Sequence, residues 1–208
     1  MHLITINQSP PTISSLPPRR PIDNLLPAML RSILAVLAAS VITFMWGWIS
    51  WEILPWHQPI PFENEDVVVE AIKANTSSHA IYAYPAWKMS EDTQKKSIQG
   101  PVIYAMVRPG PNDYSTMTSG MIQGFLINIL ASTALLLLIQ KSGHTEFLDR
   151  LSVALLAGLF LGIVSALYPW NWLEAPGMET IATLADGIIP WTLAGAAIAA
   201  ILPKKRTA

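Results

Sequence analysis

The sequence predicts an all-α membrane protein: a four-helix transmembrane bundle with a small extracytoplasmic α/β insertion between the first and second spans. The first observation is composition, because 51% of the 208 residues are hydrophobic and only 13% are charged, whereas a soluble domain has about 25% charged residues. The second is that four long stretches hold almost no charge. The third is that lysine and arginine gather beside alternate ends of these stretches, as in multi-pass membrane proteins.

The spacing between charged residues locates the spans, because a helix needs about 20 mostly apolar residues to cross ~30 Å of hydrocarbon. Residues 32–51, 114–140 and 151–173 include no charged side chain, and residues 180–203 include one, Asp186. We therefore predict transmembrane helices at 28–53, 118–140, 151–170 and 180–203. A cytoplasmic turn at 141–150 and an outer loop at 171–179 join the last three.

The flanking cations predict the orientation, because Lys/Arg-rich loops stay in the cytoplasm. They lie before the first span, between the second and third, and after the fourth, at Arg19, Arg20, Arg31, Lys141, Arg150, Lys204, Lys205 and Arg206. Both termini, including residues 204–208, are therefore expected in the cytoplasm and residues 54–117 outside a bacterial inner membrane. Six of the eight tryptophans fall at the predicted outer interface as anchors: Trp46, Trp48, Trp51, Trp56, Trp170 and Trp172.

The first span is predicted to be an uncleaved anchor, because it is longer than a signal-peptide core and no A-x-A site follows it before the tryptophans. Residues 1–27 contain six prolines, which favour an extended cytoplasmic tail. The alternative for this tail is a docking peptide, because a Pro-rich stretch such as PPRRP is a preformed ligand shape.

The outer segment, residues 54–117, is predicted to form a small α/β unit. Asn64 is expected to cap a helix that runs from Glu65 to about Ala74, with two acids in its first turn. Two runs rich in Ile, Val and Tyr, 80–84 and 102–107, are predicted to pair as a hairpin. The polar stretch between them, 86–99, is predicted to be a solvated loop.

Small residues recur every fourth position in three spans, which predicts close helix contacts. The second span has Gly120, Gly124, Asn128 and Ser132, and the third has Ala154, Gly158, Gly162 and Ala166. On the fourth span the contact face is predicted to contain Thr183, Asp186, Pro190, Ala194 and Ala197, with Leu184, Ile188, Trp191 and Ile198 turned away. A compact antiparallel bundle follows from these stripes.

Asp186 is the main candidate for a functional side chain, because an ionised carboxylate within a span is costly and needs a partner or water. Pro190 leaves the carbonyl of Asp186 without its helical hydrogen bond. The candidate intramembrane polar site comprises Asp186, Gln123, Asn128 and Thr183. Asp186 is expected either to fix the bundle, bonded to Gln123, Thr183, Asn171 or an indole N–H, or to handle ions, protons or a ligand. Asn128 is expected to bond across the bundle.

Other chemistry is not supported by the sequence. The absence of cysteine excludes disulfides, thiolate metal sites and cysteine nucleophiles, and no hydrolase, P-loop or dinucleotide motif occurs. A net charge of −1 argues against nucleic-acid binding. An outer metal site is conceivable only from residues with no standard ligand spacing: His57, Glu63, Glu65, Asp66 and His79. We therefore expect no catalytic residue, no metal and no cofactor.

Several segments, among them WGWISWEILPWH, FENEDVVVEAIKAN, GPVIYAMVRPG, YPWNWLE and LADGIIPWTLAG, resemble a group of uncharacterised bacterial four-span membrane proteins. The resemblance covers about residues 46–195 and implies an inner-membrane location without implying an activity. Because catalytic motifs are missing, we expect an accessory or scaffolding protein that contacts a protein partner, or a second copy of itself, through its outer unit. The alternative is a small proton-coupled or cation-binding carrier or channel that uses Asp186.

Overall fold

The structure is a computed structural model, and it describes residues 25–86, 88, 90–111 and 115–204. The prediction for the tail falls almost wholly outside these residues. The long helices are α1 (Leu25–Trp48), α4 (Ser115–Lys141), α5 (Phe147–Leu173) and α6 (Gly177–Ile201). Between α1 and α4 lie a π-helical turn (Ile49–Ile53), α2 (Glu65–Asn75), β1 (Ala80–Tyr84), α3 (Glu91–Gln99) and β2 (Ile103–Val107).

Four helices are long and apolar enough to cross a membrane, at Pro27–Ile53, Met117–Lys141, Phe147–Leu173 and Gly177–Ile201. This finding confirms four apolar helices, as expected for a multi-pass membrane protein. Three of these helices, α4, α5 and α6, are longer than the predicted spans, so that only residues 174–176 separate α5 from α6. Charge spacing locates the hydrocarbon, whereas a helix continues until its backbone is capped or broken.

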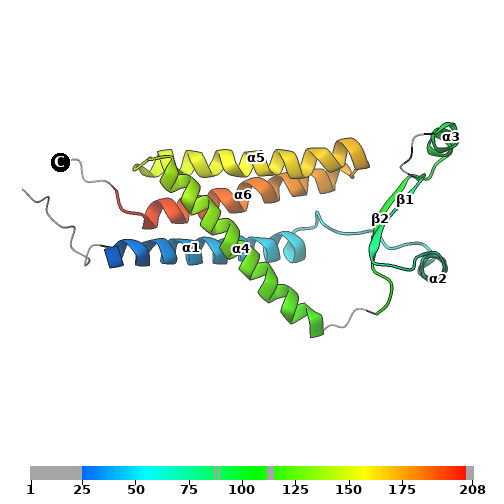
Figure 1. The fold of residues 1–208 in the computed structure, drawn as a ribbon, viewed down its shortest axis with the longest axis horizontal. Coiled ribbons are helices and arrows are strands. Elements are labelled where there is room, and N and C mark those ends of the chain that lie inside the picture. Colours follow the sequence, from blue (N-terminus) through cyan, green and yellow to red (C-terminus); the bar gives the residue numbers. More distant parts are fainter. Residues whose placement is uncertain (1–24, 87, 89, 112–114, 205–208) are drawn as a thin grey trace, which may run out of the picture.

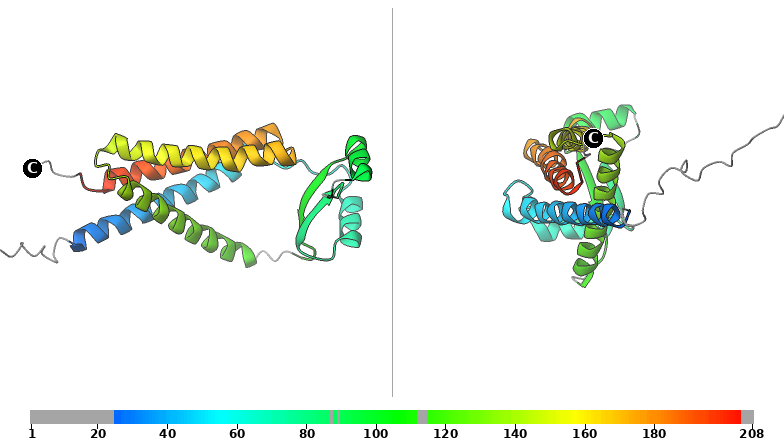
Figure 2. Two further views of the ribbon diagram at one scale, coloured as in Figure 1. Left: turned by 45° about the horizontal axis from the view of Figure 1, so that its top comes forward. Right: turned by 90° about the vertical axis from the view of Figure 1, so that its left-hand side faces the viewer.

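The four helices are not equally packed. α5 and α6 lie side by side, α1 packs against α6, and α4 crosses the others obliquely (Figures 1 and 2). The buried core lies where α6 ends and includes Ala35 and Ala39 of α1, Ile139 of α4, and Ile198 of α6. Gly120 and Gly124, near the start of α4, have no atom close to where a Cβ would lie. Three helices thus pack tightly, and the first half of α4 diverges from the predicted compact bundle.

Small residues allow the close approach of α5 and α6. The predicted α5 stripe of Ala154, Gly158, Gly162 and Ala166 is buried. A Cβ on Gly187 of α6 would lie 2.2 Å from the Cα of Gly162, so the two backbones touch. The predicted outward face of α6 was wrong, because α6 packs against both α5 and α1. Ile198 is fully buried, Trp191 packs against the core, and Leu184 and Ile188 lie against the α5 glycines.

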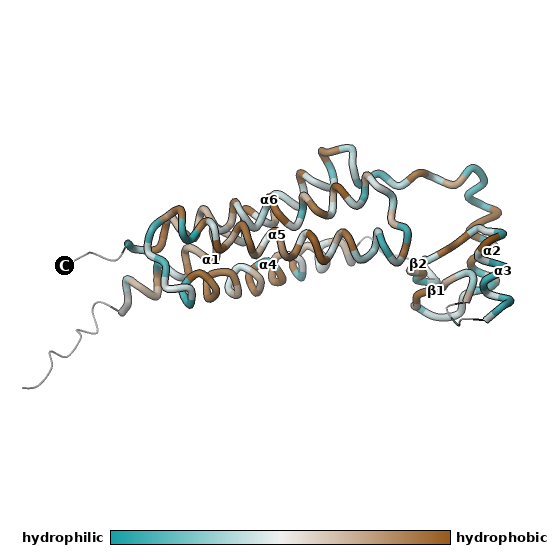
Figure 3. Tube along the Cα trace, turned by 90° about the horizontal axis from the view of Figure 1, so that it is seen from above, coloured by the Kyte–Doolittle hydropathy of each residue, from teal (hydrophilic) through white to brown (hydrophobic). Residues whose placement is uncertain are grey.

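The predicted helix and hairpin between α1 and α4 are confirmed. The Asn64 side chain accepts a hydrogen bond from the Val67 N–H at the start of α2, and β1 pairs with β2 in an antiparallel sheet. In Figures 1 and 3, α2 and α3 lie beyond the hairpin, on the side away from the long helices. Figure 3 also shows the apolar character of the long helices and the more polar character of α2 and α3.

The prediction of a solvated loop at 86–99 was wrong, because residues Glu91–Gln99 form α3. Ser90 and Thr93 make a reciprocal capping box at its start, and Lys96 pairs with Asp92 one turn earlier at 2.6 Å. The helix ends at Gly100, whose φ of 66° suits glycine. Caps and a charge pair define this helix without an apolar stripe, which is why hydrophobic periodicity did not reveal it.

Candidate functional site: a polar cluster between the end of α1 and α6

The end of α1 widens into a π-helical turn that brings polar groups toward α6. Leu54 closes this turn by donating its N–H to the Ile49 carbonyl at 3.0 Å. Pro55 has no N–H, so it cannot serve the Ser50 carbonyl five residues earlier in the π pattern. The Trp56 indole N–H donates to that carbonyl instead, at 2.9 Å. The chain therefore folds back over the end of α1, which places His57 beside α6.

Asp186 of α6 is the centre of the cluster. Its Oδ1 accepts hydrogen bonds from the Trp46 indole N–H at 2.8 Å and from the Ser50 hydroxyl at 2.7 Å. Its Oδ2 lies 3.0 Å from Nε2 of His57. Both carboxylate oxygens are thus engaged by side chains from α1 and the turn after it, which ties the first span to the fourth.

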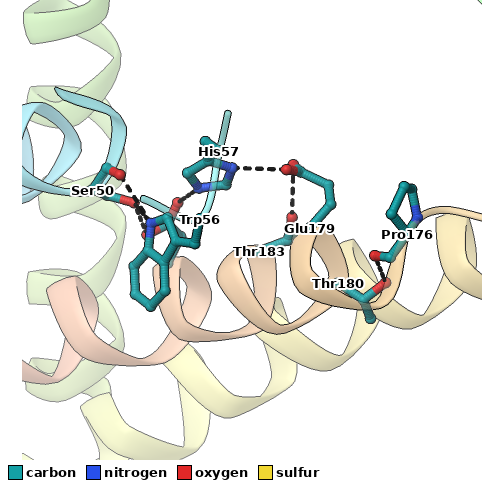
Figure 4. A network of polar contacts seen from close by, with 8 residues as sticks. Ser50, Trp56, His57, Pro176, Glu179, Thr180 and Thr183 are labelled. Atoms are coloured by element: carbon teal, nitrogen blue, oxygen red, sulfur yellow. Dashed lines mark hydrogen bonds and ion pairs between the residues drawn. The ribbon is translucent and has the colours of Figure 1, made fainter. Parts of the chain in front are cut away.

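His57 bridges two carboxylates, as Figure 4 shows for Glu179. Its Nδ1 lies 2.9 Å from Glu179 Oε2, and its Nε2 faces Asp186. A neutral imidazole has one N–H and one lone pair, so only the imidazolium can donate to two ionised carboxylates. The ring also stacks on Trp51, with centroids 4.3 Å apart and planes 7° apart. The His57 side chain is 2% exposed, so the cation is shielded from water.

Opposing effects act on the protonation of His57. Burial lowers the pKa of His57, whereas the hydrogen bonds and negative charges of Glu179 and Asp186 raise it, and the net result is a pKa above the ordinary 6.5. The imidazolium therefore persists closer to neutral pH than in a free histidine. Glu179, whose side chain is 42% exposed, connects this buried cation to the surface.

The predicted site residues are only partly brought together. Thr183 makes no side-chain hydrogen bond to Asp186 and instead donates to Glu179 Oε1 at 3.5 Å. Gln123 is exposed on α4, and Asn128 donates to Gly124 O of its own helix at 3.0 Å rather than across the bundle. Of the bonding partners predicted for Asp186, the structure shows an indole N–H, that of Trp46.

The six predicted interface tryptophans divide into two groups. Trp46 and Trp56 are half-buried and donate within the cluster. The other four are more than half exposed, near the ends of α1 and α5: Trp48, Trp51, Trp170 and Trp172. Pro55, which comes after the π-helical turn, directly precedes Trp56.

Sequence reasoning missed Ser50 and Glu179, and it named His57 only for an outer metal site without standard ligand spacing. The signal for His57 was its place just after Pro55 and Trp56, where the chain must leave the helix. Sequence spacing gave no sign that the chain folds back onto α6, more than 120 residues away.

The cluster places one titratable ring between two carboxylates. The two carboxylates lie on opposite nitrogens of His57, so the three groups form a row. Within the part of the chain that the structure describes, no group of three His, Asp or Glu side chains is placed to hold a metal ion. Comparison with known proteins found no matching family model, no matching curated protein and no matching solved structure.

Proposed function

We propose that this protein is a non-enzymatic integral membrane accessory protein that presents residues 54–117 to a partner protein. In this proposal it crosses a bacterial inner membrane four times, with both termini in the cytoplasm and the α/β unit outside. The distribution of Lys and Arg supports this orientation. The position of the unit supports it as well, because the unit lies beyond the end of α1, near the end of α5 and the start of α6 (Figure 1).

The observation that carries the proposal is the lack of a buried interior in the α/β unit. None of the described residues between 58 and 111 is buried, although many are large and apolar. A two-stranded sheet of this size is marginally stable when it stands alone. Exposed apolar side chains in such a unit are typical of a surface that another protein covers.

One face of the hairpin is the favoured contact surface. Ile81 pairs with Met106 and Ala83 pairs with Tyr104, and opposite residues of paired strands share a face. Ile81 is 55% exposed and Met106 is 81% exposed. This face carries no Lys or Arg, the residues that attract an anionic lipid surface, which favours a protein over the membrane as its partner.

The polar cluster supports the same role because the connection from α1 to the unit begins in it. His57 begins the connection from α1 to the unit, and both of its ring nitrogens face carboxylates of α6. A contact made by the unit is thereby mechanically linked to the membrane helices. No catalytic step is needed for this role.

The test is the size of the native complex after mild-detergent solubilisation at native abundance. The proposal expects a species larger than the 22.8 kDa chain with its detergent, containing either another protein or a second copy. Ile81→Glu should dissociate it, whereas Ile98→Glu, on the exposed surface of α3, should not. A monodisperse monomer, or equal effects of the two substitutions, would contradict the proposal.

The second candidate function is proton-coupled transport, which the row of Glu179, His57 and Asp186 favours. These groups could pass a proton from the exposed Glu179 to a carboxylate inside a span. Replacing Asp186 with Asn and measuring proton flux in vesicles separates the two functions. Loss of a flux seen in the parent protein supports transport; no flux in the parent, or an unchanged flux in the variant, supports the accessory role.

A further inference from the structure

A buried cation lies at the opposite end of α6 from Asp186. Arg150 of α5 is only 6% exposed. Its Nε donates to the His144 carbonyl at 3.0 Å, and its Nη1 donates to the carbonyls of Leu202 at 2.9 Å and Ala199 at 3.4 Å. Its Nη2 donates to the Pro203 carbonyl at 2.8 Å. The guanidinium thus caps the last turn of α6.

These bonds leave the charge of Arg150 without a full counter-charge. The carbonyls at a helix end together amount to only about half an elementary negative charge, and Arg150 forms no ion pair with any described carboxylate. A guanidinium has five N–H donors, and the four bonds leave one N–H on Nη2. A buried cation is costly unless an anion accompanies it.

A cavity of about 370 Å³ opens beside this guanidinium. Its lining includes Arg150, Lys204, His144, Gln140 and Ser32, which come from α5, α1, the end of α4 and the loops at this end. The lining includes no Asp or Glu, and all five of these side chains can donate a hydrogen bond. The volume is at the small end of the range for ligand sites, which suits a compact anion.

The position of the cavity corresponds to the depth of lipid headgroups. α4 and α5 each have 27 residues and are about 40 Å long at 1.5 Å per residue. Their length exceeds the ~30 Å hydrocarbon by about 5 Å at each end. The cavity lies at the end of α4 and the start of α5, where an anionic headgroup would be in reach.

We propose that this cavity binds an anionic phosphate group, of the kind that an acidic phospholipid headgroup presents. The phosphate oxygens accept from the remaining Nη2 N–H of Arg150 and from Lys204, and they supply the missing negative charge. Lys204 is available for this contact, since its 3.1 Å pair with Glu146 is between side chains that are both more than half exposed, and such pairs contribute little. Glu146 is the competing anion at this site.

Native mass spectrometry of the full-length protein tests the proposal. The probes are phosphatidylglycerol and phosphatidylcholine with the same acyl chains, added separately to the protein in mild detergent. A second arm uses inorganic phosphate against chloride at equal ionic strength and follows thermal unfolding. The variants are Ser32→Phe, which fills the cavity and leaves the Arg150 bonds in place, and Lys204→Gln. Lys73→Gln, an exposed lysine on α2, is the matched control.

The parent protein should bind one phosphatidylglycerol with about tenfold preference over phosphatidylcholine, which corresponds to one decade in Kd. Ser32→Phe should remove the preference, Lys204→Gln should reduce it about threefold, and Lys73→Gln should leave it unchanged. If Ser32→Phe does not fold, Lys204→Gln decides. Stabilisation by inorganic phosphate without a lipid preference would support the phosphate site and assign it to a soluble ligand. Neither effect in the parent, or equal binding by all variants, would overturn the proposal.

Discussion

Both ends of α6 are held by one ionisable side chain each, but in opposite ways. At one end the Asp186 carboxylate receives donors from Trp46, Ser50 and His57. At the other end the Arg150 guanidinium donates only to backbone carbonyls. The first tie depends on the identity of several side chains and on their protonation, whereas the second depends on Arg150 alone, which stays charged at every accessible pH. The protein therefore has one end that can respond to pH and one that cannot.

The largest expected effect is at the backbone contact between α5 and α6, which lies between the two ends of α6. Gly187→Ala would place a Cβ 2.2 Å from the Cα of Gly162, and backbone atoms cannot move aside as a side chain can. We expect a loss of about 3 kcal/mol in the free energy of unfolding, measured in detergent by denaturant titration. Gly124→Ala on α4, where a Cβ meets nothing within 4 Å, is the matched control and should be neutral. Equal losses would show that α5 and α6 are not in backbone contact.

The next largest effects come from removing the hydrogen bonds of Asp186 and those of Arg150, one at a time. Asp186→Ala leaves the His57 imidazolium and two other donors without their acceptor, which should destabilise the protein by about 2 kcal/mol. Arg150→Ala leaves the carbonyls of Leu202 and Pro203 without their donor beside a cavity that gives water access to them, so a loss of about 1 kcal/mol is expected. Thermal unfolding of the two variants in the same detergent gives the order. A larger loss for Arg150→Ala would reverse the comparison.

The smallest effect is the pH dependence of the Asp186 end. Because the pKa of His57 is raised in the folded protein, its contribution to stability is fully present below the ordinary pKa of 6.5 and is lost as the pH rises through the raised value. The unfolding temperature should therefore fall as the pH rises above the ordinary pKa of 6.5. His57→Gln should flatten this fall, and His79→Gln, at an exposed position, should not.

The parent and His57→Gln profiles decide this prediction. If the two profiles are parallel over the whole range, the carboxylates of the cluster do not raise the pKa of His57. The proposed difference in pH response between the two ends of α6 is then wrong.

The sequence predicted features that depend on local pattern. Four apolar helices, the Asn64 cap, the hairpin and the α5 stripe follow from composition, capping chemistry and periodicity. The α3 helix was missed because its signals are a Ser90–Thr93 capping box and a charge pair rather than an apolar face. The divergence of α4 was missed because a stripe of small residues permits contact without requiring it.

The partners of Asp186 show a further limit of sequence reasoning. The carboxylate itself stood out, because a charge inside a span needs a partner. Its partner His57 was considered only for an outer metal site, because linear spacing does not show that the π-helical turn and Pro55 direct the chain back onto α6. Arg150 was interpreted as an orientation signal, and its burial against the end of α6 depends on a contact about 50 residues away.

The central claim, that the middle of the chain lies across the membrane from both ends, is tested most directly by labelling single cysteines in a chain that has none of its own. The substitutions are Ser78→Cys, just before β1, and Lys204→Cys, just after α6. In intact cells an impermeant maleimide should label the first, and it should label the second only after permeabilisation. Labelling of Lys204→Cys in intact cells with protection of Ser78→Cys would contradict the orientation and the accessory function proposed from it.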